Sequence, residues 1–111
     1  MLPEIHKKVW GEELWIANNE YYCGKILRIN KGYRCSYHCH PIKDETFYIL
    51  KGEVLMRFEG NEFTMKRGDS LRVFPGQYHS FTGLIDSEIL EISTPHSDDD
   101  VVRMDESRAV L

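Results

Sequence analysis

The chain has 111 residues, of which 41% are hydrophobic and 29% charged, and its formal net charge is −4. These values are typical of one soluble globular domain, and the lack of a basic stripe argues against a nucleic-acid-binding protein. No apolar run approaches the roughly 18 residues that a membrane span requires, and the N-terminus lacks the features of a signal peptide. We therefore expect a cytoplasmic protein with neither a nucleic-acid nor a membrane partner.

Short β-prone runs separated by turn residues follow one another along the chain, which predicts an all-β fold. The expected strands cover 14–17, 21–29, 33–40, 45–50, 54–58, 62–65, 71–74, 79–82 and 88–94. So many short strands fit a closed antiparallel β-barrel, or jelly roll. Near the C-terminus, the acidic run 97–100 could cap one helical turn over 101–103, or belong to a solvated or dimer-packing tail.

Two histidines stand two positions apart, at His38 and His40. Alternate residues of a strand point to the same side, so both can reach one point in space. Glu45 beyond a short bend and His79 from a separate strand would complete a set of three nitrogens and one carboxylate. Such a set predicts one divalent transition metal ion as cofactor, namely Zn, Mn, Fe, Co or Ni.

Three cysteines, an odd number without a secretory context, indicate free thiols: Cys23, Cys35 and Cys39. Cys39 lies between two candidate ligands, but the period of a strand places it on the opposite face. We expect it to be a buried structural thiol.

Glycines surround the four candidate ligands at regular distances. Gly32 and Gly52 flank the first three ligands, and Gly68 and Gly76 precede the fourth. With the ligands, this pattern resembles both metal motifs of the cupin superfamily, and it differs only in a shifted proline and in Gly83, where the family has an asparagine. The resemblance implies a small cupin-type β-barrel with the metal inside, bound by His38, His40, Glu45 and His79. It also implies a single cupin domain over 1–111, with an N-terminal strand or arm (1–20), a barrel core (21–94) and a C-terminal tail (95–111).

A looser resemblance covers nearly the whole chain. The opening Trp10-Gly11-Glu12-Glu13 and the ending Val101-Val102-Arg103 after an acidic stretch are similar to the cupin-type mannose-6-phosphate isomerase domain. That family tends to carry a Gln at the place of His38 and an Arg between the second ligand and the glutamate. Here Lys43 stands in that gap and could supply the positive charge, as a point charge and not a bidentate fork.

Several further residues are candidates for substrate binding or catalysis. Strand parity places Arg34 on the metal's face, where it could hold an anionic substrate group, or it extends its head into water. Lys25 shares its face with an apolar row and is either a partner of a substrate phosphate or carboxylate or a rim residue. Glu91 faces either the cavity or solvent; in an apolar cavity its pKa would rise and it could act as a general base.

The remaining histidines and the two tryptophans carry weaker expectations. His6 and His96 lie near the chain ends and are expected at the surface. Trp10 and Trp15 are expected in core or subunit packing, although an indole ring can also form a sugar-stacking wall.

Three functions are compatible with these residues. The first is an aldose–ketose isomerase acting on a sugar or sugar phosphate through a metal-stabilised enediolate, with Glu91 or Lys25 moving the proton. The second is an iron-dependent dioxygenase of small molecules, and the third is a non-catalytic barrel that binds a sugar or another small molecule. We expect the isomerase, an enzyme with a small carbohydrate substrate. We also expect a homodimer, because the strand edges of an incompletely closed barrel need covering.

Overall fold

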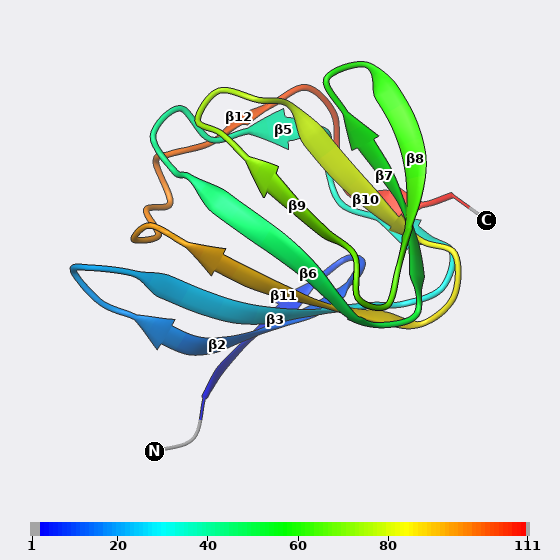
Figure 1. Cartoon of the computed structure of the whole chain (residues 1–111), viewed down its shortest axis with the longest axis horizontal. Coiled ribbons are helices and arrows are strands. Elements are labelled where there is room, and N and C mark those ends of the chain that lie inside the picture. Colours follow the sequence, from blue (N-terminus) through cyan, green and yellow to red (C-terminus); the bar gives the residue numbers. More distant parts are fainter. Residues whose placement is uncertain (1–2, 111) are drawn as a thin grey trace.

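Two antiparallel β-sheets face each other in the computed structural model, which describes residues 3–110 (Figure 1). The first sheet has six strands, in the order β1 (Glu4–Lys8), β2 (Gly11–Asn18), β3 (Cys23–Ile29), β11 (Ser87–Ser93), β6 (Glu45–Lys51) and β9 (Ser70–Val73). Residues 3–110 contain no helix, and hence none that could span a membrane. The predicted all-β antiparallel jelly roll is confirmed.

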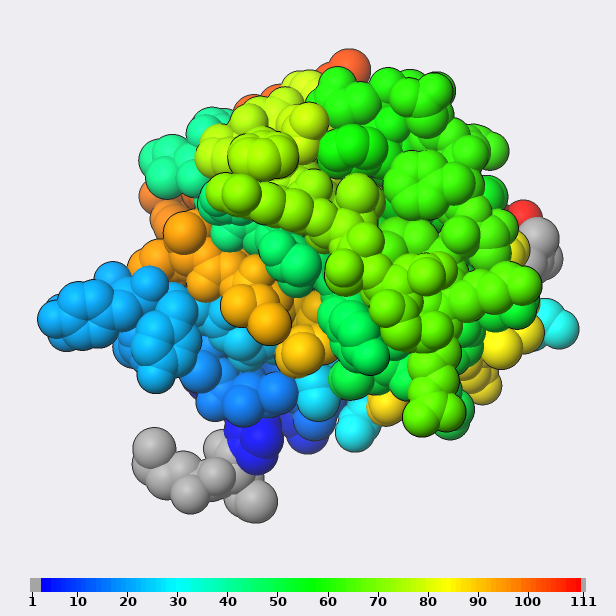
Figure 2. Space-filling model, in the orientation of Figure 1, coloured from blue at the N-terminus to red at the C-terminus, as the bar shows by residue number. Residues whose placement is uncertain are grey.

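The second sheet is built mainly of short strands. Its central order is β12 (Val102–Arg103), β5 (His38–Cys39), β10 (His79–Gly83), β4 (Tyr33–Arg34) and β13 (Arg108–Ala109). Strand β10 also pairs with β7 (Glu53–Phe58), and β7 pairs in turn with β8 (Asn61–Lys66). The space-filling view shows the hairpin of β7 and β8, in green, on the opposite side of the molecule from the N-terminal strands, in blue (Figure 2). The hairpin and the N-terminal strands therefore form different walls of the barrel.

The central strands of the first sheet direct alternate side chains between the two sheets. In β3, β11 and β6 every second residue is buried, the pattern of a sheet with one solvated face. The strand register places Lys25, Glu91 and Phe47 in one inward row, and Cys23, Ser93 and Glu45 in the next. Charged side chains from neighbouring strands thereby meet inside the barrel.

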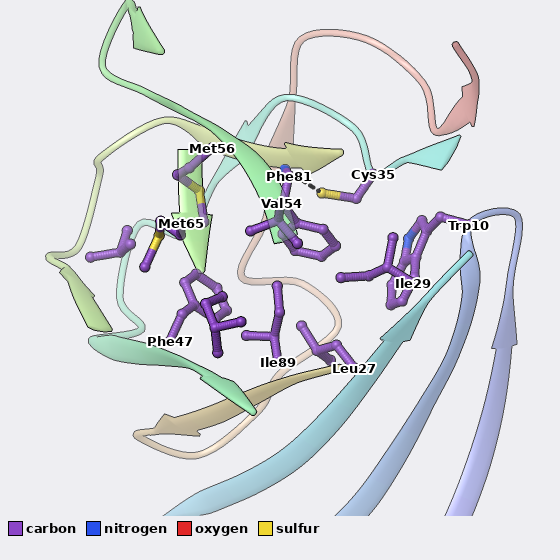
Figure 3. Close-up of a cluster of buried hydrophobic side chains, with 12 residues drawn as sticks. Trp10, Leu27, Ile29, Cys35, Phe47, Val54, Met56, Met65, Phe81 and Ile89 are labelled. Atoms are coloured by element: carbon purple, nitrogen blue, oxygen red, sulfur yellow. Dashed lines mark hydrogen bonds between the residues drawn. The ribbon is translucent and has the colours of Figure 1, made fainter. Parts of the chain in front are cut away.

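Apolar side chains fill one part of the space between the sheets (Figure 3). The core cluster consists of Trp10, Leu27, Ile29, Cys35, Phe47, Ile49, Val54, Met56, Met65, Val73, Phe81 and Ile89. Leu27, Phe47 and Phe81 also line the polar cavity described below, so the core ends where that cavity begins. Cys23, Cys35 and Cys39 are free and buried, as expected.

The turn after β6 depends on glycine. Gly52 has a φ of +91°, and a Cβ at this position would lie 2.2 Å from Oγ of Ser87. Both the backbone conformation and the space therefore exclude a larger residue. This explains the glycine that follows the candidate glutamate ligand in the sequence pattern.

The structure corrects three expectations about the strands. β1 was not expected, and the strand expected over 33–40 is divided into β4 and β5 by an irregular segment. No helical turn forms over 101–103; β12 pairs there with β5, and β13 pairs with β4. The tail adds strands because the short edges of the second sheet leave main-chain groups that need hydrogen-bond partners.

Candidate metal centre

Three histidines from adjacent parts of the second sheet converge at one point. The candidate ligand atoms of His38, His40 and His79 all lie within 4.8 Å of one another. His38 in β5 is paired directly with His79 in β10, and His40 follows β5 two positions after His38. The alternation of side chains that the sequence predicted therefore operates over the short strand β5.

Each of these histidines is oriented by a main-chain carbonyl. Nδ1 of His38 lies 2.7 Å from the carbonyl oxygen of Ser36, and Nδ1 of His40 lies 2.7 Å from that of Asp100. Nδ1 of His79 lies 3.0 Å from the carbonyl oxygen of Gln77. A carbonyl oxygen can only accept a hydrogen bond, so Nδ1 carries the proton in each ring. Nε2 is then left with a free lone pair, as in histidines that bind metals.

Glu45, the first residue of β6, adds a carboxylate to this group. Its Oε2 lies 3.5 Å from Nε2 of His40 and 3.3 Å from Nε2 of His79. Glu45 is only 1% exposed, yet neither of its oxygens has a hydrogen-bond partner, and the same holds for Nε2 of His79. A buried carboxylate without partners is costly unless it binds a cation.

These orphaned polar atoms fit a divalent metal ion. Ligand atoms bonded to one ion at about 2.0–2.2 Å lie about 3 Å apart, close to the separations around Glu45. Burial favours the neutral form of His38 and His40, which metal binding requires: burial, followed by the neighbouring His79, lowers the pKa of His38 to about 3. Burial also lowers the pKa of His40, although Glu45 opposes the shift. The three histidines, with Glu45 beside them, could hold one metal ion.

A cavity of about 250 Å³ adjoins this group. Its wall contains three of the four other side chains that the sequence singled out, Lys25, Lys43 and Glu91, all of them buried. Nζ of Lys43 lies 3.5 Å from Oε2 of Glu91. The structure therefore places these three side chains beside the candidate ligands, and their roles in binding or catalysis stay predictions.

Arg34 lies elsewhere, and the expectation that it faces the metal's side is wrong. Its guanidinium donates to the carboxylate of Asp105 at 2.9 Å and lines a separate groove with Arg57 and Arg108. The alternation of strand faces does not carry through the irregular segment between β4 and β5, where Cys35 and Ser36 both line the cavity.

Glu91 differs from expectation in its electrostatics. Burial by itself opposes ionisation, but the positive charges of Lys43 and Lys25 outweigh it and lower the pKa of Glu91 below its ordinary value. The expected rise of this pKa is therefore wrong, because the cavity is lined by cations and not only by apolar groups. Glu91 is an ionised carboxylate.

Sequence reasoning missed the residues that cover the cavity beside Lys25. His6 and His96, expected at the surface, both line the cavity together with Glu13 and Trp15. The ring of His6 stacks on Trp15 with centroids 4.0 Å apart, His96 meets the same indole edge-on at 4.7 Å, and Nζ of Lys25 lies 4.3 Å from its centroid. No local signal predicts this cluster, because its members come from β1, β2, β3 and the tail.

Both tryptophans line the cavity, and other side chains pack against their rings. His6 and Lys25 pack on Trp15. Trp10 is 4% exposed and packs edge-on against Phe81 in the core, with ring centroids 5.5 Å apart. Both rings are therefore in packing contacts, and the alternative that an indole ring forms a sugar-stacking wall stays a prediction.

The C-terminal segment is largely exposed, as a solvated tail would be, but one of its residues supports the site. Asp100 is buried, and its carboxylate accepts hydrogen bonds from the main-chain N–H groups of Ile42 and Lys43 at 2.8 and 2.9 Å. Its carbonyl orients His40, as described above. The acidic run therefore supplies a support for one candidate metal ligand.

Comparison with known proteins agrees with this fold. The model of the family "Cupin domain" matches residues 25–92, more than half of the chain, and the chain belongs to this family. A stretch of 53 residues is 30% identical to the tetracenomycin polyketide synthase protein TcmJ of Streptomyces glaucescens, covering 48% of this chain. The chain matches only 36% of the length of that relative.

Solved structures of other small barrels superimpose over most of the chain. KdgF from Halomonas sp. gives a TM-score of 0.79 at 18% identity, with 86% of this chain and 89% of that chain covered. An RmlC-like cupin from Shewanella frigidimarina gives 0.80 at 19% identity, with 87% of each chain covered. Similarity at this level of identity shows the fold alone.

Proposed function

We propose that this chain is a metal-dependent isomerase that interconverts an aldose and a ketose, either a sugar or a sugar phosphate. The observation that carries the proposal is that Glu91, a carboxylate outside the ligand group, lines the same cavity as His38, His40 and Glu45. Moving a carbonyl to a neighbouring carbon requires a polarised carbonyl oxygen and a base that transfers a proton between the two carbons. A ligand group and a separate carboxylate in one cavity provide for both.

The residues of the cavity have distinct roles in this proposal. His38, His40, Glu45 and His79 would hold one divalent ion, which when bound supplies a Lewis acid for carbonyl and hydroxyl oxygens. Glu91 takes the proton from the carbon that bears the hydroxyl group and returns it to the former carbonyl carbon, while the hydroxyl proton moves to the former carbonyl oxygen.

The surroundings of Glu91 fix the form in which it enters this transfer: an ionised carboxylate, and a weaker base than an isolated glutamate. The positive charge of Lys43, 3.5 Å away, keeps the carboxylate ionised before the proton arrives. Leu27, Phe47 and Phe81 form the apolar end of the cavity and limit the access of water to the proton in transit.

A proton-transfer assay tests the proposal directly. The protein, loaded with manganese, zinc or cobalt, is incubated in D₂O with a panel of aldoses, ketoses and their phosphates, and the products are followed by ¹H NMR. We expect at least one aldose–ketose pair to interconvert. Deuterium should then appear in the product at the carbon that receives the transferred proton. The His40→Ala variant should lose this activity, because it loses a candidate metal ligand.

Two other outcomes would contradict the proposed isomerase activity and favour a different function. Oxygen consumption by the iron-loaded protein, without interconversion of any sugar, would favour the dioxygenase, which uses the same ligand group. Saturable sugar binding without turnover under any metal would favour a binding barrel.

A further inference from the structure

We infer that Lys25 and Lys43 form an anion-binding subsite that holds a carboxylate or phosphate group of the substrate, apart from the candidate metal ligands. This inference rests on the proposed function only in naming the reaction that the bound molecule undergoes. The binding of an anion follows from the hydrogen-bonding groups of the cavity itself.

Both lysine side chains point their ammonium groups at one acceptor. Lys25 and Lys43 are buried, with side chains 3% and 2% exposed. Nζ of Lys25 lies 3.1 Å from Nδ1 of His96, and Nζ of Lys43 lies 3.5 Å from the same atom. The two positive charges are therefore brought close to a single ring nitrogen.

His96 is fixed as the acceptor in this arrangement. Its Nε2 lies 2.7 Å from Oδ1 of Asp98, a carboxylate that can only accept when ionised. Nε2 therefore carries the proton, and Nδ1 has one lone pair to share between two lysines. Because each ammonium group has three N–H donors, His96 satisfies only a small part of their capacity.

The nearby carboxylates balance the charge without filling these donors. Glu91 lies 3.5 Å from Nζ of Lys43, and Glu13 lies 3.7 Å from Nζ of Lys25. Both distances exceed the roughly 2.7–2.9 Å of a charge-assisted hydrogen bond. Oε1 of Glu13, the closer oxygen, already accepts a hydrogen bond from Nε1 of Trp15 at 2.9 Å.

An oxyanion matches this surplus of donors. Two buried ammonium groups that converge from different strands offer several N–H groups to one small anion, and a carboxylate or phosphate presents several acceptor oxygens in return. The subsite also adjoins the candidate metal centre, because Lys43 stands two positions before Glu45 and both line the same cavity. One small molecule could therefore contact both.

Calorimetric titration of the cobalt-loaded protein tests the subsite. Inorganic phosphate and acetate are used as separate probes, and the variants are Lys25→Met, Lys43→Met and, as a control, Lys31→Met. Lys31 is an exposed lysine outside the cavity. We expect saturable binding to the wild type and to Lys31→Met, and affinity at least about tenfold weaker in the two cavity variants.

The two probes distinguish the source of the anion. Binding of phosphate alone assigns a phosphorylated substrate, binding of acetate alone assigns a carboxylic acid, and binding of both supports a shared oxyanion site. The visible spectrum of cobalt is recorded in parallel, because an anion held by the lysines should leave it unchanged. No saturable binding of either probe, or equal affinity in wild type and cavity variants, overturns the subsite.

A measurement on the wild type alone covers the case in which a cavity variant does not fold. Phosphate or acetate added to the zinc-loaded protein should shift the ¹³Cε NMR signals of two lysines, and shifts in neither would overturn the subsite. Anion binding in a protein without isomerase activity would contradict the proposed reaction and still support the subsite. Isomerisation of neutral sugars without anion binding would remove the subsite alone.

Discussion

The carbonyl oxygen of Asp100 accepts a hydrogen bond from Nδ1 of His40 at 2.7 Å, so a residue of the C-terminal segment orients a candidate metal ligand 60 positions earlier in the chain. The carboxylate of Asp100 fixes this geometry, since it accepts hydrogen bonds from the main-chain N–H groups of Ile42 and Lys43. The loop between β5 and β6 and the C-terminal segment are thus held together by one aspartate.

Replacement of Asp100 should weaken both the fold and the site. Asp100→Ala leaves two main-chain donors without their acceptor, which should lower the free energy of unfolding by about 1–3 kcal/mol. It also releases the carbonyl that orients His40, which should lower metal affinity by about 10- to 100-fold. Urea denaturation and a competitive zinc titration measure the two effects. Asp99→Ala, at an exposed neighbour, should change neither quantity, and equal behaviour of the two variants would contradict the prediction.

Glu45 should stabilise the protein only when a metal is bound. In the metal-free protein its buried oxygens have no hydrogen-bond partners, so Glu45→Met should raise the free energy of unfolding by about 1–4 kcal/mol. The same variant lacks one ligand and should show a much smaller rise in Tm on addition of zinc. Differential scanning calorimetry with and without zinc tests both statements. A variant that is less stable without metal and keeps the full zinc shift would show that Glu45 is no ligand.

Glu91 should be needed for turnover and not for metal binding. Glu91→Gln keeps the size of the side chain but cannot take a proton, so kcat should fall by about 10²- to 10⁴-fold with an unchanged metal content. Glu88→Gln is the matched control, because Glu88 lies on the same strand and pairs with Arg28 outside the cavity. Steady-state kinetics and elemental analysis give the comparison. Full activity of Glu91→Gln would exclude this carboxylate as the base.

The same carboxylate should make stability depend on pH. The pKa of Glu91 in the folded protein is lower than its ordinary value of 4.5, chiefly because Lys43 and Lys25 outweigh the effect of burial. The unfolded chain therefore binds more protons in the interval between these two pKa values, and stability falls as the pH falls through it. This contribution is fully present above about pH 4.5.

Urea denaturation of the metal-free protein between pH 7 and pH 3 measures this dependence. The wild type should lose more stability over this range than Glu91→Gln, in which the titrating group is absent. Other carboxylates with lowered pKa values, such as Asp44 and Asp98, are common to both proteins and cancel in the comparison. Parallel pH profiles would mean that Glu91 is not held in its charged form by the lysines.

Local periodicity was enough to predict the parts of this protein that lie on regular strands. His38 on β5 and His40 directly after it share one face, so their common orientation follows from sequence spacing. The glycine at Gly52 could be interpreted in the same way, because its backbone conformation is a local requirement. The sequence left the orientation of Lys25 and Glu91 open, and the pairing of β3 with β11 decided it.

The same rule failed where the backbone leaves the strand. Arg34 turns to the outer groove because the segment between β4 and β5 is irregular, and no spacing rule applies there. Asp100 and His96 reach the site from the C-terminal segment, where an acidic run by itself suggests a capped helical turn or a solvated or dimer-packing tail. Their partners, His40 and the two lysines, are more than 50 positions away in the chain.

The sequence by itself therefore predicted the barrel, its glycine turns and the four candidate metal ligands, because alternation along a strand and the spacing of glycines and ligands can be read from the order of residues. Only the tertiary structure decided how His79 meets His38 and what surrounds the ligands: the pairing of Lys43 with Glu91, the lysines shared by His96, and the packing of His6 and Lys25 on Trp15. These features depend on the order of strands across the sheets, which brings residues from both ends of the chain into one cavity. The charge of that cavity, and with it the ionisation of Glu91, is a property of the assembled barrel and not of any one strand.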